Sequence, residues 1–115
     1  MQKSILTPDQ YKDLSKKIIY AVGTKYRIIP LNSLKHPEYH LKAPIYVTLE
    51  FEEDKVIASF DDIEAFSYAD TASEAINLLS DEIIQIFEDL MEDKENLGSL
   101  PRKWLQYLEE IIECR

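Results

Sequence analysis

In the middle of this chain the spacing of apolar residues changes once, from that of a strand to that of a helix. From Ile45 to Phe51 apolar and polar residues alternate, so that Ile45, Val47, Leu49 and Phe51 share one side of an extended strand. After Thr71 the apolar residues recur with the period of a helix instead. A half-buried strand followed by a long amphipathic helix excludes an all-helical or an all-strand fold for this segment.

The helical segment opens with a capping box. In Thr71-Ala72-Ser73-Glu74 the threonine can accept a backbone N–H, and the glutamate three residues later can reach back to the cap. The apolar side chains that follow lie along one stripe: Ala75, Ile76, Leu79, Ile83, Ile86, Phe87 and Leu90. The pattern predicts a helix that ends between Asp93 and Gly98.

Two further strands are expected between the alternating strand and this helix. A polar turn over residues 52–54 separates the first strand from Lys55–Phe60, which makes the pair a hairpin. Residues 61–64 form a polar corner, and Ala65–Tyr68 is a third short strand.

The N-terminal segment predicts one helix, one strand and a loop. Thr7-Pro8-Asp9-Gln10 is a helix start, and the apolar residues to Val22 fall near one face, with Gly23 as the stop. Tyr26–Ile29 is a short strand that Pro30 ends. Residues 30–44 hold three prolines and are expected to form a loop, which is functional or hides a short element.

A third helix is expected over residues 99–113, capped by Ser99 or Leu100. At 115 residues the chain forms one domain, with an N-terminal segment over residues 1–44, a core over residues 45–95 and the C-terminal helix. The order of elements predicts an α+β fold in which a small antiparallel sheet of three to four strands packs on helices.

Composition removes several classes of site. The chain has two glycines, too few for a glycine-rich phosphate loop or a dinucleotide fingerprint. One cysteine, Cys114, excludes an internal disulfide framework and a cysteine-based zinc site. We expect no cofactor, no metal and no catalytic residue.

Charge is distributed unevenly along the chain. The net charge is −9, yet residues 1–47 carry eight Lys/Arg against three Asp/Glu, and residues 48–95 carry two Lys against sixteen Asp/Glu. Such a negative segment repels phosphate backbones and attracts a basic protein. The candidate partner-binding residues are Glu50, Asp61, Asp62, Glu88, Asp89, Glu92 and Asp93. The alternative is that these acids form a solvated face that keeps the protein soluble.

The sequence also indicates where the protein works. We expect no signal peptide and no membrane span, which favours a cytoplasmic protein. Arg102 and Lys103 are the one basic pair of the expected third helix, too little for a DNA-binding module. A sheet of about three strands leaves unpaired edges, so we expect a homo-oligomer, in the first place a dimer formed by strand addition.

Residues 45–90 resemble the HicB-like antitoxin domain, a small partial ribonuclease-H-like fold. The likeness is carried by the strand Ile45–Phe51, by the second strand with its corner over 56–63, and by Ala69-Asp70-Thr71-Ala72-Ser73-Glu74-Ala75. The last piece is similar to the family's Gly-Asp-Thr-x-x-Glu-Ala at a helix start. The resemblance implies a noncatalytic antitoxin that neutralises a basic, RNA-cleaving toxin by covering its active surface.

Two alternatives remain open. The chain is either an oligomeric structural or regulatory module, or a metal-dependent nuclease that uses clustered carboxylates near strand ends. The carboxylates that a nuclease would use are Glu50, Glu52, Asp61, Asp62, Glu64 and Asp70. His36 and His40, four residues apart, could chelate a metal on a helix, but Pro37 argues for a loop with two ordinary histidines.

Overall fold

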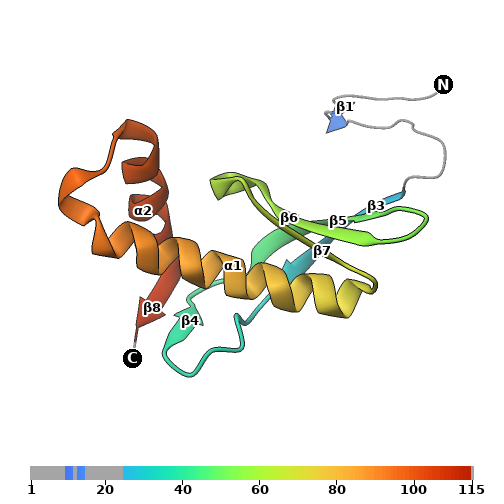
Figure 1. Ribbon diagram of the computed structural model, residues 1–115, viewed down its shortest axis with the longest axis horizontal. Helices are drawn as coiled ribbons and strands as arrows, with labels where there is room; N and C mark the ends of the chain where they lie inside the picture. The colour runs from blue at the N-terminus through green and yellow to red at the C-terminus, as the bar shows by residue number, and fades with distance from the viewer. Residues whose placement is uncertain (1–9, 12, 15–24, 115) are drawn as a thin grey trace.

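The computed structural model describes residues 10, 11, 13, 14 and 25–114 of the chain. Its centre is a four-stranded antiparallel sheet with the strand order β3-β5-β6-β7. The four strands are β3 (Lys25–Leu31), β5 (Ile45–Phe51), β6 (Val56–Phe60) and β7 (Ala65–Ala69). The long helix α1 (Ala72–Glu92) lies across one face of this sheet (Figure 1). The α+β fold with a sheet of three to four strands is confirmed.

The alternation of residues decides which side of the sheet meets α1. Val47 and Leu49 of β5 and Ala58 of β6 point toward the helix and are buried. From α1 most of the predicted apolar stripe is buried against them, including Leu79 and Ile83. Ile76 and Ile86 of the stripe are half-buried, and Ile84, which the stripe did not include, is buried. These side chains form one core in which both patterns, period two and period 3.6, turn their apolar side inward.

The capping box operates as the sequence predicts. The Thr71 hydroxyl oxygen accepts the Glu74 backbone N–H at 3.2 Å, and the same hydroxyl donates to the Glu74 carboxylate at 3.1 Å. Ahead of this cap, the corner between β6 and β7 is the short 3-10 helix η1 (Asp61–Ile63). Glu64 closes the corner in the left-handed region, with φ 57°, and its N–H donates to the Asp61 carbonyl oxygen at 3.1 Å.

The C-terminal segment differs from the expectation at its end. After the 3-10 helix η2 (Lys94–Asn96), helix α2 covers Ser99–Ile111, and its N-cap residue is Gly98 rather than Ser99 or Leu100. The expected helix was to continue to residue 113, but Ile112–Cys114 form strand β8. Helix α2 stops because the buried Ile112 pairs with Leu41 in an antiparallel ladder.

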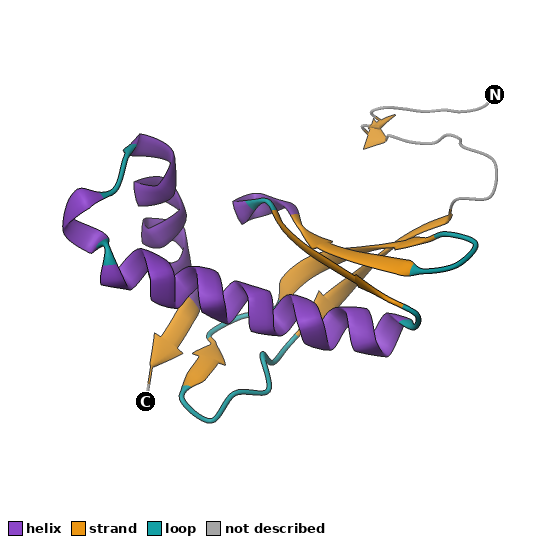
Figure 2. Cartoon of the chain, viewed as in Figure 1, coloured by secondary structure: helices purple, strands orange, loops and turns teal. Residues whose placement is uncertain are grey.

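The expected loop over residues 30–44 contains the partner of β8. Strand β4 (Tyr39–Leu41) lies in it and forms a separate two-stranded sheet with β8, at the end of the molecule where α2 also lies (Figure 2). The Lys42 N–H extends this contact by donating to the Ile111 carbonyl oxygen at 2.9 Å.

Pro30 does not end its strand, and this expectation was wrong. Strand β3 continues to Leu31, and Pro30 lies opposite Tyr46 of β5. In the described sheet β3 is an outer strand, and a proline is tolerated there because its missing N–H can face the unpaired side.

Most of the helix expected over residues 7–22 falls outside the described residues, and so do Thr7, Pro8 and Asp9 at its expected start. At the four described positions the chain is extended: β1 (Gln10–Tyr11) pairs with β2 (Asp13–Leu14). No helix among the described residues has the length and the apolar composition that crossing a membrane requires.

Candidate partner-binding surface

Helix α1 presents an acidic face on the side opposite to the core. Five exposed carboxylates occupy positions that a helix places on one side, namely Asp81, Glu82, Glu88, Asp89 and Glu92. The buried residues of α1, such as Leu79 and Ile83, lie about half a turn away. The helix therefore separates an apolar side that packs on the sheet from a negative side that faces solvent.

Two of these carboxylates make contacts within the protein. Glu88 accepts a hydrogen bond from the Tyr39 hydroxyl at 2.9 Å, and this bond raises the pKa of Tyr39. Asp89 accepts the Gln85 side-chain amide at 2.9 Å. Within the described residues no lysine or arginine forms an ion pair with the acidic face, whose charge is therefore available to a partner.

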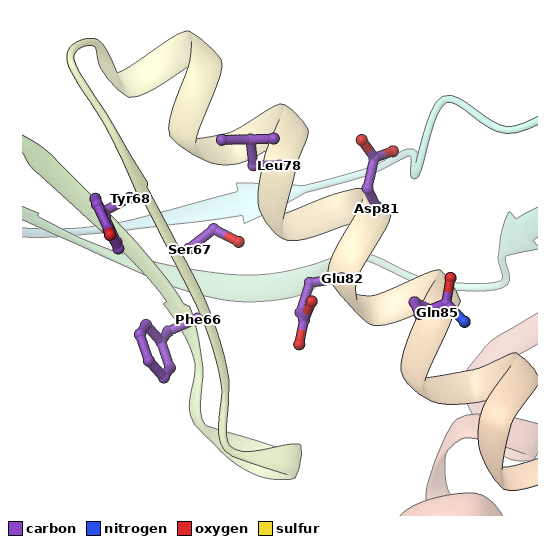
Figure 3. A pocket seen from close by; sticks show the side chains of 7 residues that line it. All are labelled: Phe66, Ser67, Tyr68, Leu78, Asp81, Glu82 and Gln85. Atoms are coloured by element: carbon purple, nitrogen blue, oxygen red, sulfur yellow. The ribbon is translucent and has the colours of Figure 1, made fainter.

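A groove runs between the N-terminal half of this face and strand β7. It encloses about 440 Å³ and is wide open to solvent. Figure 3 shows β7 on one side and α1 on the other, with Ser67 and Glu82 projecting into the space between strand and helix. The residues that line it are Phe66, Ser67, Tyr68, Leu78, Asp81, Glu82 and Gln85. We call this hollow the β7 groove.

The β7 groove combines three features that a peptide-binding edge needs. Strand β7 is the last strand of its sheet, so one of its edges is unpaired in the described structure. Leu78, with 47% of its surface exposed, supplies apolar contact area. Asp81 and Glu82 supply negative charge beside it. An extended basic segment can pair with such an edge and place its cations against the helix.

A second hollow of about 440 Å³ lies at the other half of α1, beside β4 and β8. Glu88 and Glu92, two of the residues selected from the sequence, line it together with Tyr39, Phe87, Met91 and Cys114. Tyr39 is held there by an edge-on contact with Phe87, with 5.6 Å between ring centroids, and by stacking on His36 at 4.7 Å.

The remaining candidate residues lie elsewhere. Asp61 and Asp62 are in η1, and Asp62 accepts the Tyr107 hydroxyl at 2.7 Å, which links η1 to α2. Burial, followed by this bond and by the charge of Asp62, raises the pKa of Tyr107 to about 12. Asp93 is the C-cap of α1, at the end of the acidic face.

Glu50 stands apart, on the face of the sheet that α1 does not cover. Strand alternation places it beside Tyr26 of β3. Burial, followed by the hydrogen bond and the charge of Glu52, raises its pKa to about 7, while Lys55 acts in the opposite direction. The seven candidate residues are therefore distributed over three places, and the four at α1 lie together.

Sequence reasoning missed the residues at the β7 groove. Asp81 and Glu82 are not among the candidate residues chosen from the sequence, although they precede Glu88 and Asp89 by one heptad and so share their face. Leu78 falls on this polar side as well, and an apolar residue outside the buried stripe is the signal that could have identified it.

The carboxylates that the nuclease alternative requires are separated in the fold. Glu50 pairs with Ile57 near the hairpin end of the sheet, whereas Asp61 follows the opposite end of β6, about 13 Å further along the strand direction. Among the described residues, no three His, Cys, Asp or Glu side chains are grouped to hold a metal ion. His36 accepts the Glu38 N–H through Nδ1 at 3.0 Å, and His40 Nε2 lies 3.2 Å from the Pro37 carbonyl oxygen.

Comparison with known proteins returned no matching family model, no matching curated protein and no matching solved structure.

Proposed function

We propose that this chain is a noncatalytic binding protein for a basic protein partner. The observation that carries the proposal is the combination of the acidic face of α1 with the β7 groove at its N-terminal half. The resemblance of residues 45–90 to the HicB-like domain supplies the class of partner, an RNA-cleaving toxin, and with it a cytoplasmic location.

The proposed mode of binding uses both features. An extended segment of the partner adds to the unpaired edge of β7, and its lysine or arginine side chains reach Asp81 and Glu82 across the groove. The rest of the acidic face then lies against the basic surface with which the toxin holds RNA. By occupying those cations in place of RNA, this chain blocks the toxin's active site, and no chemical step takes place on this chain.

The test is co-expression with the product of the neighbouring gene. We expect that product to be basic, to cleave RNA alone, and to co-elute with this chain in an inactive complex. Failure to cleave RNA and failure to co-elute would together contradict the proposal.

A pair of matched variants locates the contact. Asp81→Lys with Glu82→Lys should restore RNA cleavage and slow association by about tenfold or more, because steering depends on local charge. Glu53→Lys with Asp54→Lys makes the same change of charge in the exposed hairpin turn and should leave inhibition intact. Equal effects of the two pairs would show that net charge, rather than the groove, determines binding.

A second candidate function is an oligomeric structural or regulatory module whose acids only solubilise it. The observation that favours it is the apolar outer face of the sheet, which the core does not use. Inhibition of an RNA-cleaving partner distinguishes the two functions, because a purely structural module would have no such activity.

A further inference from the structure

The face of the sheet that points away from α1 is rich in exposed apolar side chains. Strand alternation brings five of them to this side, each with 60–69% of its surface exposed. They are Tyr26 and Ile28 of β3, Tyr46 of β5, and Phe66 and Tyr68 of β7. We call this surface the outer face. Large apolar side chains exposed on one side of a sheet mark an interaction site.

The strand register places the five side chains in two groups, one on β3 and β5 and the other on β7, with β6 between them. Across the sheet, Ile28 is followed by Thr48, Ser59 and Phe66 in one row. Tyr26, Glu50, Ile57 and Tyr68 form the next row, toward the hairpin. Tyr46 lies opposite Pro30, diagonally beside Ile28.

Charge on the outer face is confined to its hairpin end, where Glu52 forms a hydrogen bond with Glu50 and an ion pair with Lys55. Glu50 is the one charged residue that these described rows contain, and Lys55 reaches over the Tyr68 ring from the hairpin turn, with its Nζ 5.5 Å from the ring centroid. The whole chain carries −9, so two copies repel each other at most of their surface. Around Ile28 and Tyr46 the described rows hold no charged residue, so two copies meet there with less repulsion than elsewhere.

We propose that the outer face is the interface between two copies of this chain, packed sheet against sheet about a two-fold axis. In such a dimer the same apolar side chains of both copies face each other. Two sheets that pack face to face lie about 10 Å apart. The interface leaves the carboxylates of the acidic face free, so a dimer presents two acidic faces to basic partners, although Phe66 and Tyr68 of the outer face also line the β7 groove.

The area of the outer face is close to what a dimer needs. At roughly 150–250 Å² for each fully exposed aromatic side chain, the five exposed residues offer about 600 Å². A standard interface buries about 800 Å² on each partner, and the half-buried residues of the two rows supply the difference.

Other occupants fit this surface less well. Exposed aromatic rings on a sheet stack bases in RNA-binding domains, but those domains add a basic groove that tracks the phosphates, whereas these rows contain Glu50. A basic protein partner gains more from the acidic face of α1, and an anionic membrane repels a chain of this charge.

Glu50 makes this interface sensitive to pH. The groups that face it are Tyr26 from β3 and Glu52 and Lys55 from the hairpin. Burial and then Glu52 raise the pKa of Glu50 to about 7, against the opposite effect of Lys55. A second copy would desolvate the carboxyl further, which favours its protonated form. Association should therefore tighten as the pH falls from about 8 to about 6, across the pKa near 7 that burial and Glu52 produce.

Sedimentation velocity over about 1–200 µM full-length chain tests the proposal, since this range brackets a weak to moderate dissociation constant. We expect a monomer–dimer equilibrium that Ile28→Lys and Tyr46→Lys each weaken by at least tenfold. Leu100→Lys, which changes an exposed leucine of α2, is the matched control and should leave the dimer intact. Glu50→Gln should make the dissociation constant nearly independent of pH.

Three outcomes would overturn the proposal. The first is a monomer at the highest concentration. The second is a dimer that tolerates both Ile28→Lys and Tyr46→Lys, which would point to pairing of strand edges. The third is a monomer whose thermal midpoint falls with Ile28→Lys, which would show that the chain's own residues cover the face. Inhibition of the basic partner, measured on the same variants, should be unchanged, so failure here is distinguishable from failure of the proposed function.

Discussion

At the scale of single residues, Thr71 joins the two hydrophobic patterns of the chain. Its hydroxyl satisfies the Glu74 N–H, one of the backbone donors that the first turn of a helix leaves without a partner. The carboxylate of Glu74 in turn accepts from that hydroxyl, so sequence and geometry agree on the first residue of α1.

The contribution of this cap to the free energy of unfolding can be measured. Thr71→Ala should lower the free energy of unfolding by about 1 kcal/mol, because the Glu74 N–H loses its acceptor. Ser73→Ala, two residues on and exposed, is the matched control and should change stability by less than about 0.5 kcal/mol. Urea denaturation measures both, and equal midpoints for Thr71→Ala and the unmodified chain would refute the contribution of the cap.

At the scale of elements, strands β4 and β8 hold the C-terminal helix against the rest of the fold. They pair over three residues on each strand, and Ile112 carries the contact into the core, where 4% of its surface remains exposed. The Tyr39–Glu88 and Tyr107–Asp62 hydrogen bonds join the same end of the molecule to α1 and η1.

This attachment depends on one buried side chain more than on the exposed end of the strand. Ile112→Ala should destabilise the protein by about 2–4 kcal/mol, because it removes buried methyl groups and leaves a cavity. Cys114→Ser, at the exposed end of β8, should be nearly neutral. Differential scanning calorimetry would compare the two, and a similar small shift for both would mean that β8 contributes little to the core.

At the scale of the whole molecule, charge and apolar surface are placed on opposite sides. Helix α1 lies on one face of the sheet (Figure 1). Its acidic face is turned away from the core, and the outer face is the opposite side of the sheet. The proposed basic partner and the proposed second copy would therefore bind mainly to different surfaces, one through charge and the other through apolar contact.

Salt should weaken the first proposed contact and not the second. Between about 50 mM and 500 mM salt the screening length falls about threefold, so association with a basic partner should slow by tenfold or more. The dimer should hold or tighten, because screening reduces repulsion between two chains of charge −9 and leaves apolar contact intact. Stopped-flow binding and sedimentation would measure the two effects.

A double charge-reversal variant distinguishes electrostatic steering from direct contact in the stopped-flow measurement of partner binding. Glu92→Lys with Asp93→Lys changes the end of the acidic face but keeps Glu88, which holds Tyr39. This pair should lower the association rate at low salt and have little effect at high salt. A rate indifferent to salt for the unmodified chain would contradict a charge-directed encounter.

Local chemistry was sufficient to predict several elements from the sequence. The alternation of Ile45–Phe51 produces β5 with its apolar residues inward, and the Thr71–Glu74 box with the stripe behind it produces α1. These features depend only on residues a few positions apart, so the sequence itself contains the information needed to predict them. The acidic character of α1 could be predicted for the same reason.

Long-range pairing decided what the sequence alone did not. Pro30 continues its strand because β3 lies at the edge of the sheet, and Ile112 leaves its helix because Leu41, seventy-one positions earlier, pairs with it. The β7 groove required the position of α1 beside the last strand, and the outer face required that no described element cover the second side of the sheet. Periodicity specifies which side of an element is apolar, whereas which of those sides become buried depends on packing between segments far apart in the chain.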